Sequence, residues 1–333
     1  MKINISVIVP IYNVEKYIEK CLKKLEEQTF ETFEILAISD GSPDNSAKIV
    51  KEYQKKYSNI KFIEKKNGGY GSVLEYAIKN IKTKYFLICD PDDWLAKDCL
   101  KDLYNFAQKK DLDIVVGDRF DVYTDDNSIV KQAVKPKKIT SIKPKKVYSK
   151  KEDIYMFSFF DVSPHAKLYK TELVKNIKFP HHVSYTDFLL YIVALSHAKK
   201  IAYFNKPLAY YLRDRPGNTV TDIRRSIIND YTIVWEETFN DIKDESDNSI
   251  LLYRLYTQLR FILAEYKRVS ISGFNNQYWE EILKSILILQ SEKRKIKKIP
   301  YFEKKKINKI FLKLFLNRFT SNFIAKVYVK LKK

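Results

Sequence analysis

The sequence predicts an α/β protein with a mostly parallel central sheet that is flanked by helices and followed by a C-terminal helical region. The first 120 residues alternate short β-branched or aromatic runs with amphipathic stretches. This pattern is typical of parallel strands joined by right-handed helical crossovers. Residues 223–290 instead carry apolar side chains at helical spacing. With 333 residues, 45% of them hydrophobic, the chain is able to bury a large core.

Each expected element has a local signal. β-branched and aromatic runs predict strands at Ile3–Val9 and in the segments FEILAIS, IKFIE, YFLIC and LDIVVG. Helical spacing predicts helices over 14–25, 72–81 and 97–110, and a helix that begins near Ser42 and Pro43, a suitable N-cap and N1 pair. The segment KIAYFNKPLAYYLRDRPGNT predicts a strand pair that ends in a basic loop.

The charge of the chain is concentrated near its C-terminus. Residues 291–333 contain fifteen Lys and Arg against two Glu, which places +13 of the formal net charge of +20 in this tail. A nucleic-acid-binding protein should instead spread its cations and aromatic residues over one domain face. We therefore expect no nucleic-acid partner, and we keep a polyanion-binding protein only as an alternative.

Cysteine usage and hydropathy indicate the cellular setting. Cys21, Cys89 and Cys99 are scattered without metal-like spacing, which favours a reduced, cytoplasmic protein. The apolar runs fall short of the ~18 residues that a membrane-spanning helix needs. We expect neither a signal peptide nor a transmembrane span.

Polar loops follow the predicted strands, and they carry the chemistry. They are PIYN (10–13), SDGSPDNS (39–46), KKNGGYGS (65–72) and DPDDW (90–94). Ligands of an open α/β sheet bind outside the carboxyl ends of its strands, so these loops should open onto one rim. Taken singly, each loop is also compatible with a turn, a helix cap or a flexible connection.

The last loop holds three acids within four positions, Asp90, Asp92 and Asp93. A helix N-terminus needs only one carboxylate. Three carboxylates repel one another unless a cation lies among them, and open carboxylate sites suit Mg²⁺ or Mn²⁺ bound together with substrate phosphates. The loop therefore predicts a metal–diphosphate site.

These motifs together resemble the family 2 glycosyltransferases of GT-A fold. The resemblance covers at least Ile5 to Leu100, with Asp90-Pro91-Asp92 as the DxD motif. It implies an inverting transferase that uses a nucleoside-diphosphate sugar, usually UDP-linked, with Mn²⁺ or Mg²⁺ as cofactor. It assigns the metal to Asp92 and Asp93. The donor nucleotide is assigned to Pro10, Tyr12, Asp40, Asn67, Gly68, Asp90, Asp92, Arg213 and Arg215.

The resemblance continues through the segments PHAKLYKTELV and FPHHVSYTDFLLY. It implies that Asp187 is the general base that takes a proton from the acceptor hydroxyl. Without the family, an ordinary helix N-cap would explain Asp187 equally well. The chain departs from the family at Ser39 and Thr186, where acids are common. His165 is expected to be a surface or satisfied histidine, with an approach to the acceptor as the alternative.

The implied organisation is a catalytic domain over 1–222, with a nucleotide-sugar half over 1–123 and an acceptor half over 151–222. A helical region over 223–333 follows, with its basic amphipathic tail over 291–333. This tail either lies on an anionic membrane, at the inner face of the cell membrane, or packs its apolar face on the body. The implied acceptor is a glycan or a lipid-linked saccharide. A catalytically silent, membrane-associated partner of another transferase remains the main alternative.

Overall fold

The computed structural model describes residues 2–126, 128–215, 226–270, 276–296 and 306–331. The chain divides into two compact units, Met1–Thr221 and Asp222–Lys333. The domain boundary expected at residue 222 lies within 216–225, outside the described residues.

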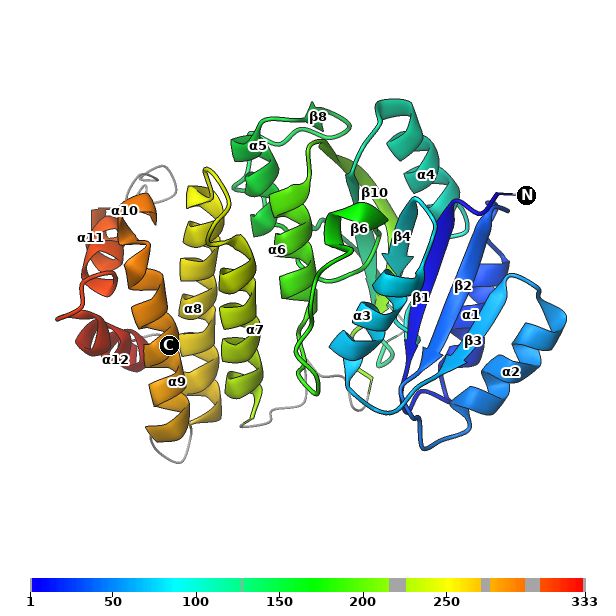
Figure 1. The fold of residues 1–333 in the computed structure, drawn as a ribbon, viewed down its shortest axis with the longest axis horizontal. Coiled ribbons are helices and arrows are strands. Elements are labelled where there is room, and N and C mark those ends of the chain that lie inside the picture. Colours follow the sequence, from blue (N-terminus) through cyan, green and yellow to red (C-terminus); the bar gives the residue numbers. More distant parts are fainter. Residues whose placement is uncertain (1, 127, 216–225, 271–275, 297–305, 332–333) are drawn as a thin grey trace. The chain divides into compact units, whose positions relative to one another are not determined.

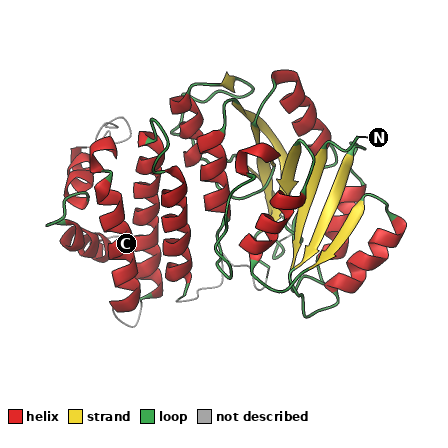
Figure 2. Ribbon diagram, in the orientation of Figure 1, coloured by secondary structure: helices red, strands yellow, loops and turns green. Residues whose placement is uncertain are grey.

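The first unit is built around one sheet with helices on both faces (Figures 1 and 2). The strands run in the order β3-β2-β1-β4-β9-β6-β10-β5, with β7 paired to β6 and β8 paired to β10. The long pairings, such as β1 with β2 and β6 with β10, are parallel, whereas the short pairings of β5, β7, β8 and β9 are antiparallel. The strands are β1 Ile5–Ile11, β2 Phe33–Ser39, β3 Ile60–Glu64, β4 Tyr85–Ile88, β5 Trp94–Leu95, β6 Ile114–Val122, β7 Ile129–Gln132, β8 Val147–Tyr148, β9 Lys167–Lys170 and β10 Ile201–Leu212.

The helices of this unit cover the apolar faces of the sheet. Buried residues of α1, α2 and α4 share one core cluster with alternate residues of β1, while α3 contacts β1 and β2 from the opposite face. The α/β class and the five strands expected before residue 120 are confirmed. The helices are α1 Ile18–Glu26, α2 Ser46–Lys56, α3 Tyr70–Asn80, α4 Cys99–Lys110, α5 Lys151–Met156 and α6 Asp187–His197, with short 3-10 turns at Phe157–Phe159 and Thr171–Val174.

Strand β9 lies in the middle of the sheet. Tyr169 pairs with Phe86 of β4 on one side and with Ile114 of β6 on the other, antiparallel to both. The segment that precedes β9 is thereby brought beside the loop that follows β4. The donor and acceptor halves expected from the sequence are consequently joined in one hydrogen-bonded sheet.

Two local expectations are wrong. Helix α2 begins at Ser46 rather than near Ser42, because the Asp44 carboxylate holds the preceding turn by accepting hydrogen bonds from the Ser42 hydroxyl at 2.6 Å and the Ser46 N–H at 3.1 Å. The expected strand pair near 201–212 is the single strand β10. Its pairing with β6 shifts register around Pro207, because a residue without an N–H is accommodated in a bulge.

The second unit is helical. It contains α7 Ile227–Ile242, α8 Ser249–Val269, α9 Asn276–Ser291, α10 Lys293–Ile296, α11 Lys306–Phe315 and α12 Ser321–Leu331. Helices α7, α8 and α9 contact one another, and the Trp235 indole donates a hydrogen bond to the Leu255 carbonyl at 2.9 Å. The described part of the basic tail packs its apolar face inward, since α12 contacts α8. Among the described residues, no helix combines the length and the apolarity that crossing a membrane requires.

We expect Gly69→Ala to destabilise the first unit. Gly69 precedes α3 with φ at +83°, and a Cβ there would lie 2.9 Å from backbone atoms of His182. Backbone strain and this clash should lower the free energy of unfolding by about 1–3 kcal/mol. Urea unfolding measures the change, with exposed Lys66→Ala as the neighbouring control. An unchanged midpoint for Gly69→Ala would contradict the expectation.

Candidate active site

The loops after β1, β2, β3 and β4 meet at one edge of the sheet, because these strands are parallel. Pro10 lies near the end of β1, Asp40 follows β2, Asn67 and Gly68 lie between β3 and α3, and Asp90 follows β4. The sequence-based expectation that these loops share a rim is therefore confirmed for the backbone. Their side chains divide into two groups with different electrostatics.

The first group is centred on Asp40, whose side chain is buried. Its carboxylate accepts hydrogen bonds from Lys65 Nζ at 2.6 Å and from the N–H groups of Gly68 and Gly69, the latter at 2.7 Å. The Asn67 amide donates to the Asp40 carbonyl at 3.0 Å. Asp40 thus holds the glycine loop in place with its own charge neutralised by lysine. The nucleoside contact assigned to it stays a prediction.

Tyr12 lies on the same rim. Its side chain is 52% exposed, an uncommon state for a large aromatic residue beside a buried strand end. The backbone turns sharply after it, since Asn13 has φ at +54° and donates its N–H to the Ser42 hydroxyl at 2.8 Å. Tyr12 is therefore available to stack on a planar ligand, as its assignment to the donor nucleotide requires.

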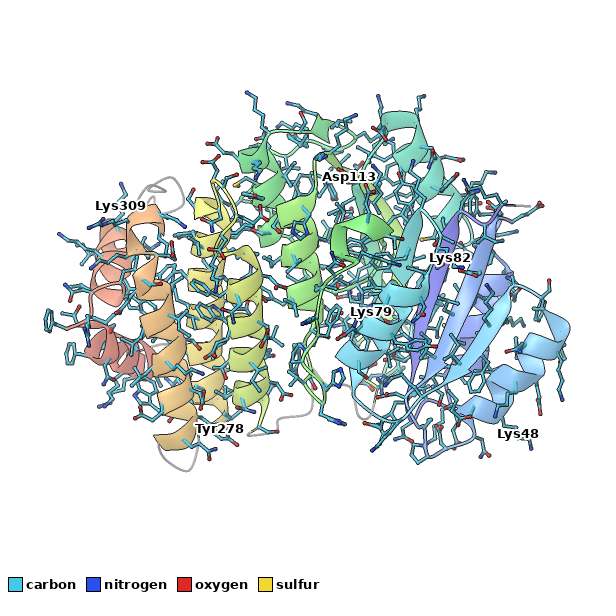
Figure 3. All side chains as sticks on the ribbon, viewed as in Figure 1. Lys48, Lys79, Lys82, Asp113, Tyr278 and Lys309 are labelled. Carbon is cyan, nitrogen blue, oxygen red and sulfur yellow. The ribbon has the colours of Figure 1, made fainter. Side chains whose placement is uncertain are left out.

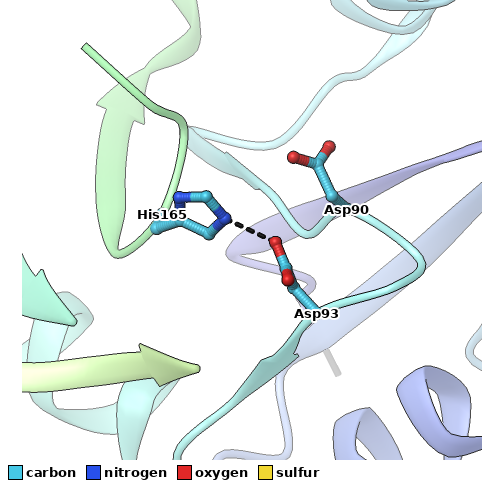
Figure 4. A group of neighbouring side chains, drawn as sticks. All are labelled: Asp90, Asp93 and His165. Carbon is cyan, nitrogen blue, oxygen red and sulfur yellow. Dashed lines mark hydrogen bonds and ion pairs between the residues drawn. The ribbon is translucent and has the colours of Figure 1, made fainter. Parts of the chain in front are cut away.

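The second group is an acidic cluster with a histidine (Figure 4). His165 Nε2 and Asp93 Oδ2 are 2.5 Å apart, and the Leu212 N–H donates to Asp93 Oδ1 at 2.8 Å. Ligand atoms of Asp90, Asp93 and His165 all lie within 4.8 Å of one another. Carboxylate and imidazole ligands together fit a divalent ion such as Mn²⁺. The sequence favoured a surface or a satisfied histidine, and the structure shows a buried His165 whose Nε2 is paired with Asp93.

Burial dominates the electrostatics of this cluster. It raises the pKa of Asp90 and Asp93 well above the ordinary value, and the charge of neighbouring acids raises them further. Burial lowers the pKa of His165 to about 4, so the imidazole is neutral at pH 7. A neutral imidazole is the form that binds a metal. The charges of Arg215 and Arg119 oppose the rise in the pKa of Asp93 without cancelling it.

Asp92 points to a different partner. Its carboxylate accepts a hydrogen bond from Arg215 Nε, and the Arg215 guanidinium also lies 5.4 Å from the centre of the Tyr17 ring. Asp92 is not part of the group formed by Asp90, Asp93 and His165, and the assignment of the metal to Asp92 with Asp93 stays a prediction.

Arg213 lies close to the same strand end. Its Nε is 3.7 Å from an oxygen of Asp121, and its guanidinium lies 5.0 Å from the centre of the Tyr211 ring. The Tyr211 ring in turn lies against His165, with ring centres 4.5 Å apart. Stacking and ion pairing place Arg213 at the border of the acidic cluster.

Asp187 opens helix α6, directly after Thr186. Its Oδ1 is buried without a hydrogen-bond partner among the described residues. Burial raises the pKa of Asp187 to about 6, while a hydrogen bond with Tyr70 and the charge of Lys167 oppose this rise. The single proton of the Tyr70 hydroxyl is shared between Asp187 and Asp90, whose Oδ1 lies 3.1 Å from the hydroxyl oxygen. Tyr70 thereby connects the acidic cluster to Asp187.

Sequence reasoning missed the buried cations behind this site. Lys167 on β9 is buried, and its ammonium donates to the Ser163 carbonyl. Burial lowers its pKa to about 8. Arg119 holds the same segment through Asp161 at 2.8 Å and the Ser163 hydroxyl at 2.9 Å. The sequence did contain a signal for this group, the lysine inside the apolar run AKLY. Because lysine is rarely fully buried without a partner, a lysine in a predicted buried strand indicates an acceptor nearby.

The amino-acid sequence of this chain is similar to a known protein family and to several curated proteins. Residues 6–178 match the sequence model described as Glycosyl transferase family 2. The chain is 31% identical over 221 residues to Glycosyltransferase GlyA of Streptococcus pneumoniae serotype 4, covering 64% of this chain and 31% of that protein. It is 32% identical over 228 residues to the Poly(ribitol-phosphate) beta-glucosyltransferase of Bacillus spizizenii, covering 64% and 33%. The matched part thus spans about a third of each of these relatives.

The fold has counterparts among solved structures. The crystal structure of residues 1–349 of TarS from S. aureus, in complex with UDP-GlcNAc, superposes with a TM-score of 0.73 at 22% identity. The superposition covers 98% of this chain and 91% of that one. This likeness confirms the GT-A fold, with C-terminal helices, expected from the sequence. Because the family match extends over more than half of the chain, this protein belongs to glycosyl transferase family 2.

Proposed function

We propose that this protein is a metal-dependent, inverting glycosyltransferase that moves a hexosyl or N-acetylhexosaminyl group from a UDP-sugar to an acceptor hydroxyl. The observation that carries the proposal is that a crowded carboxylate–histidine cluster lies close to another carboxylate, outside the cluster, whose pKa is raised. Asp90, Asp93 and His165 form the cluster, and Asp187 is connected to it through Tyr70. Single-displacement transfer needs these two parts, a site for the departing diphosphate and a general base.

The donor half of the site lies on the rim of β1, β2 and β4. We assign the metal to Asp93 with Asp90 and His165, and with Asp92 once its carboxylate is released from Arg215. A divalent ion bound there supplies positive charge that stabilises the leaving diphosphate. The family assignment of Mn²⁺ or Mg²⁺ stands, and the imidazole favours Mn²⁺, since Mg²⁺ prefers oxygen ligands.

Arg215 has a second role in this proposal. Arginine binds phosphate oxygens through two parallel N–H donors, as it binds a carboxylate. Its bond to Asp92 would therefore keep both side chains in place for the donor. The Arg215 guanidinium would bind the diphosphate, and the Asp92 carboxylate, once released, would help to hold the metal. Arg213, Tyr12, Pro10, Asn67 and Gly68 complete the proposed nucleotide site.

The acceptor half is centred on Asp187. Its raised pKa of about 6 lets the carboxylate be ionised at neutral pH while remaining basic enough to take a hydroxyl proton. The unpartnered Oδ1 supplies the acceptor for that proton. An N-cap role does not account for it, because Thr186 occupies the N-cap position.

The acceptor is proposed from the relatives. One is named Poly(ribitol-phosphate) beta-glucosyltransferase, another Minor teichoic acid biosynthesis protein GgaB. We propose a glycan or lipid-linked acceptor in bacterial surface polysaccharide, teichoic-acid or glycoprotein biosynthesis. The cysteines, free and buried, agree with a cytoplasmic site of action. A silent partner of another transferase is the competing proposal, and nucleotide binding distinguishes the two.

We expect UDP together with Mn²⁺ to raise the unfolding temperature of the wild-type protein more than either ligand alone. At 100 times its dissociation constant a ligand adds about 2.7 kcal/mol to the free energy of unfolding. Thermal unfolding with UDP, GDP, ADP or CMP, with and without Mn²⁺, measures the effect. Asp93→Asn should abolish the metal-dependent part of the rise.

Asp244→Asn is the matched control, because Asp244 is an exposed acid of the second unit. It should respond to UDP and Mn²⁺ as the wild type does. If no nucleotide stabilises the folded wild-type protein, the sugar-nucleotide proposal fails and the silent-partner proposal replaces it.

We expect Asp187→Asn to lower kcat by about 10²–10⁴-fold without weakening the binding of UDP with Mn²⁺, because a general base acts only in the chemical step. Initial rates with a UDP-sugar and a hydroxyl acceptor measure this, with Asp153→Asn on α5 as control. In the wild type the rate should fall as the pH drops through about 6, since Asp187 must be ionised. A variant with full kcat would remove Asp187 from this role.

We also expect Asp187→Asn to stabilise the protein at neutral pH. The pKa of Asp187 is raised from 3.8 to about 6, so the folded state holds its proton more tightly than the unfolded state does. Ionisation of Asp187 therefore costs stability as the pH rises from about 4 through about 6, by about 3 kcal/mol in all. Urea unfolding at pH 4 and pH 7.5 should show a gain for the variant only at pH 7.5. Equal gains at both values would exclude the carboxylate charge as the cause.

A further inference from the structure

The turn between α11 and α12 exposes aromatic side chains that the rest of the second unit does not cover. Phe319 is 92% exposed and Phe323 is 68% exposed, and Ile310 on α11 is 45% exposed. Most exposed apolar residues occur singly and need no explanation. Here two exposed phenylalanines occur within five residues, Phe319 in the turn and Phe323 in the first turn of α12.

The inner face of the same two helices is well packed. Phe311 and Phe315 stack with ring centres 5.9 Å apart, Phe311 also meets Tyr328 at 5.3 Å, and Tyr256 of α8 meets Phe315 at 5.3 Å. The Arg260 guanidinium lies 5.5 Å from the centre of the Phe311 ring. The apolar face that folding requires is thus already occupied, and Phe319 and Phe323 lie outside it.

The exposed position of Phe319 is fixed by its turn. The Phe319 N–H donates to the Asn317 side chain at 2.9 Å, and the Thr320 hydroxyl donates to the Leu314 carbonyl at 2.6 Å. The Ser321 N–H donates to the Asn317 carbonyl at 2.9 Å. These bonds close the turn and hold the Phe319 backbone at its outer edge.

The described part of the tail also carries exposed cations. Lys309, Lys313, Arg318, Lys326 and Lys330 are all exposed, and Lys309 is labelled in Figure 3. From Lys304 to Lys333 the sequence contains ten Lys and Arg and no Asp or Glu. Exposed rings on a segment whose charged residues are all cations match the interfacial region of an anionic bilayer, where aromatic side chains enter the headgroup layer and cations meet lipid phosphates.

We propose that the α11–α12 turn is a membrane-docking surface, in which Phe319 and Phe323 insert into an anionic lipid surface and the flanking cations contact its headgroups. Charge argues against a second copy of this chain as the occupant, because a symmetric contact would bring the same cations face to face. Apolar exposure argues against a soluble polyanion, which would leave both rings in water. The proposal does not depend on the chemistry proposed for the first unit.

Co-sedimentation of the full chain with vesicles tests this surface. We expect binding to equimolar phosphatidylcholine and phosphatidylglycerol, little binding to phosphatidylcholine alone, and weaker binding as salt is added. Replacing both phenylalanines (Phe319→Ala with Phe323→Ala) should weaken binding by about tenfold or more, since two rings lose their burial in lipid. The double variant Ile129→Ala with Val130→Ala is the matched control, because these apolar residues of the first unit are 56% and 49% exposed.

A second variant keeps the test independent of the alanine substitutions. The added fluorescence of Phe319→Trp should shift to the blue with the anionic vesicles and stay unchanged with phosphatidylcholine alone. The proposal is overturned if the wild-type protein does not bind the anionic vesicles or if the double phenylalanine variant binds them as tightly as the wild type. It is also overturned if the emission maximum of the Phe319→Trp variant does not shift. It is equally overturned if sedimentation velocity finds a dimer that the phenylalanine substitutions dissociate.

Discussion

The site depends on one constraint, the crowding of carboxylates in a poorly solvated place at the end of β4. Asp90 and Asp93 lie close together there with Asp187 nearby, and burial raises the pKa of all three. The chain relieves the crowding only in part, through the Tyr70 hydroxyl, the Leu212 N–H, His165 and the charges of Arg119 and Arg215. A ligand that brings positive charge would neutralise the negative charge that these groups leave unpaired.

The contrast with Asp40 makes this constraint visible. Both acid groups follow parallel strands of one sheet, but Asp40 has a lysine and two backbone N–H groups of its own. A buried carboxylate whose charge is paired within the fold can stabilise that fold. A buried carboxylate without sufficient pairing lowers the free energy of unfolding, and the packing of the rest of the domain must offset that loss. The two loops look alike in the sequence because each is a short polar run that combines Asp with Pro.

Local pattern was sufficient to predict the alternating strands and helices, the shared rim, and the acids of the DPDD run. It was insufficient for contacts between residues far apart in the chain. His165 meets Asp93 across 72 positions and Arg215 meets Asp92 across 123. The first pair depends on β9 entering the sheet between β4 and β6, and the second on the pairing of β10 with the two-residue strand β5. Strands of four and two residues carry too little periodicity to reveal their neighbours.

The central position of β9 also sets an order of events during synthesis. Until residues 167–170 have been made, the facing edges of β4 and β6 have no strand between them, although both strands are complete once Val122 has been added. Unpaired edges recruit other strands, including those of neighbouring chains. Nascent chains that pause before β9 therefore present two open edges, and such chains should be the ones that depend most on chaperones.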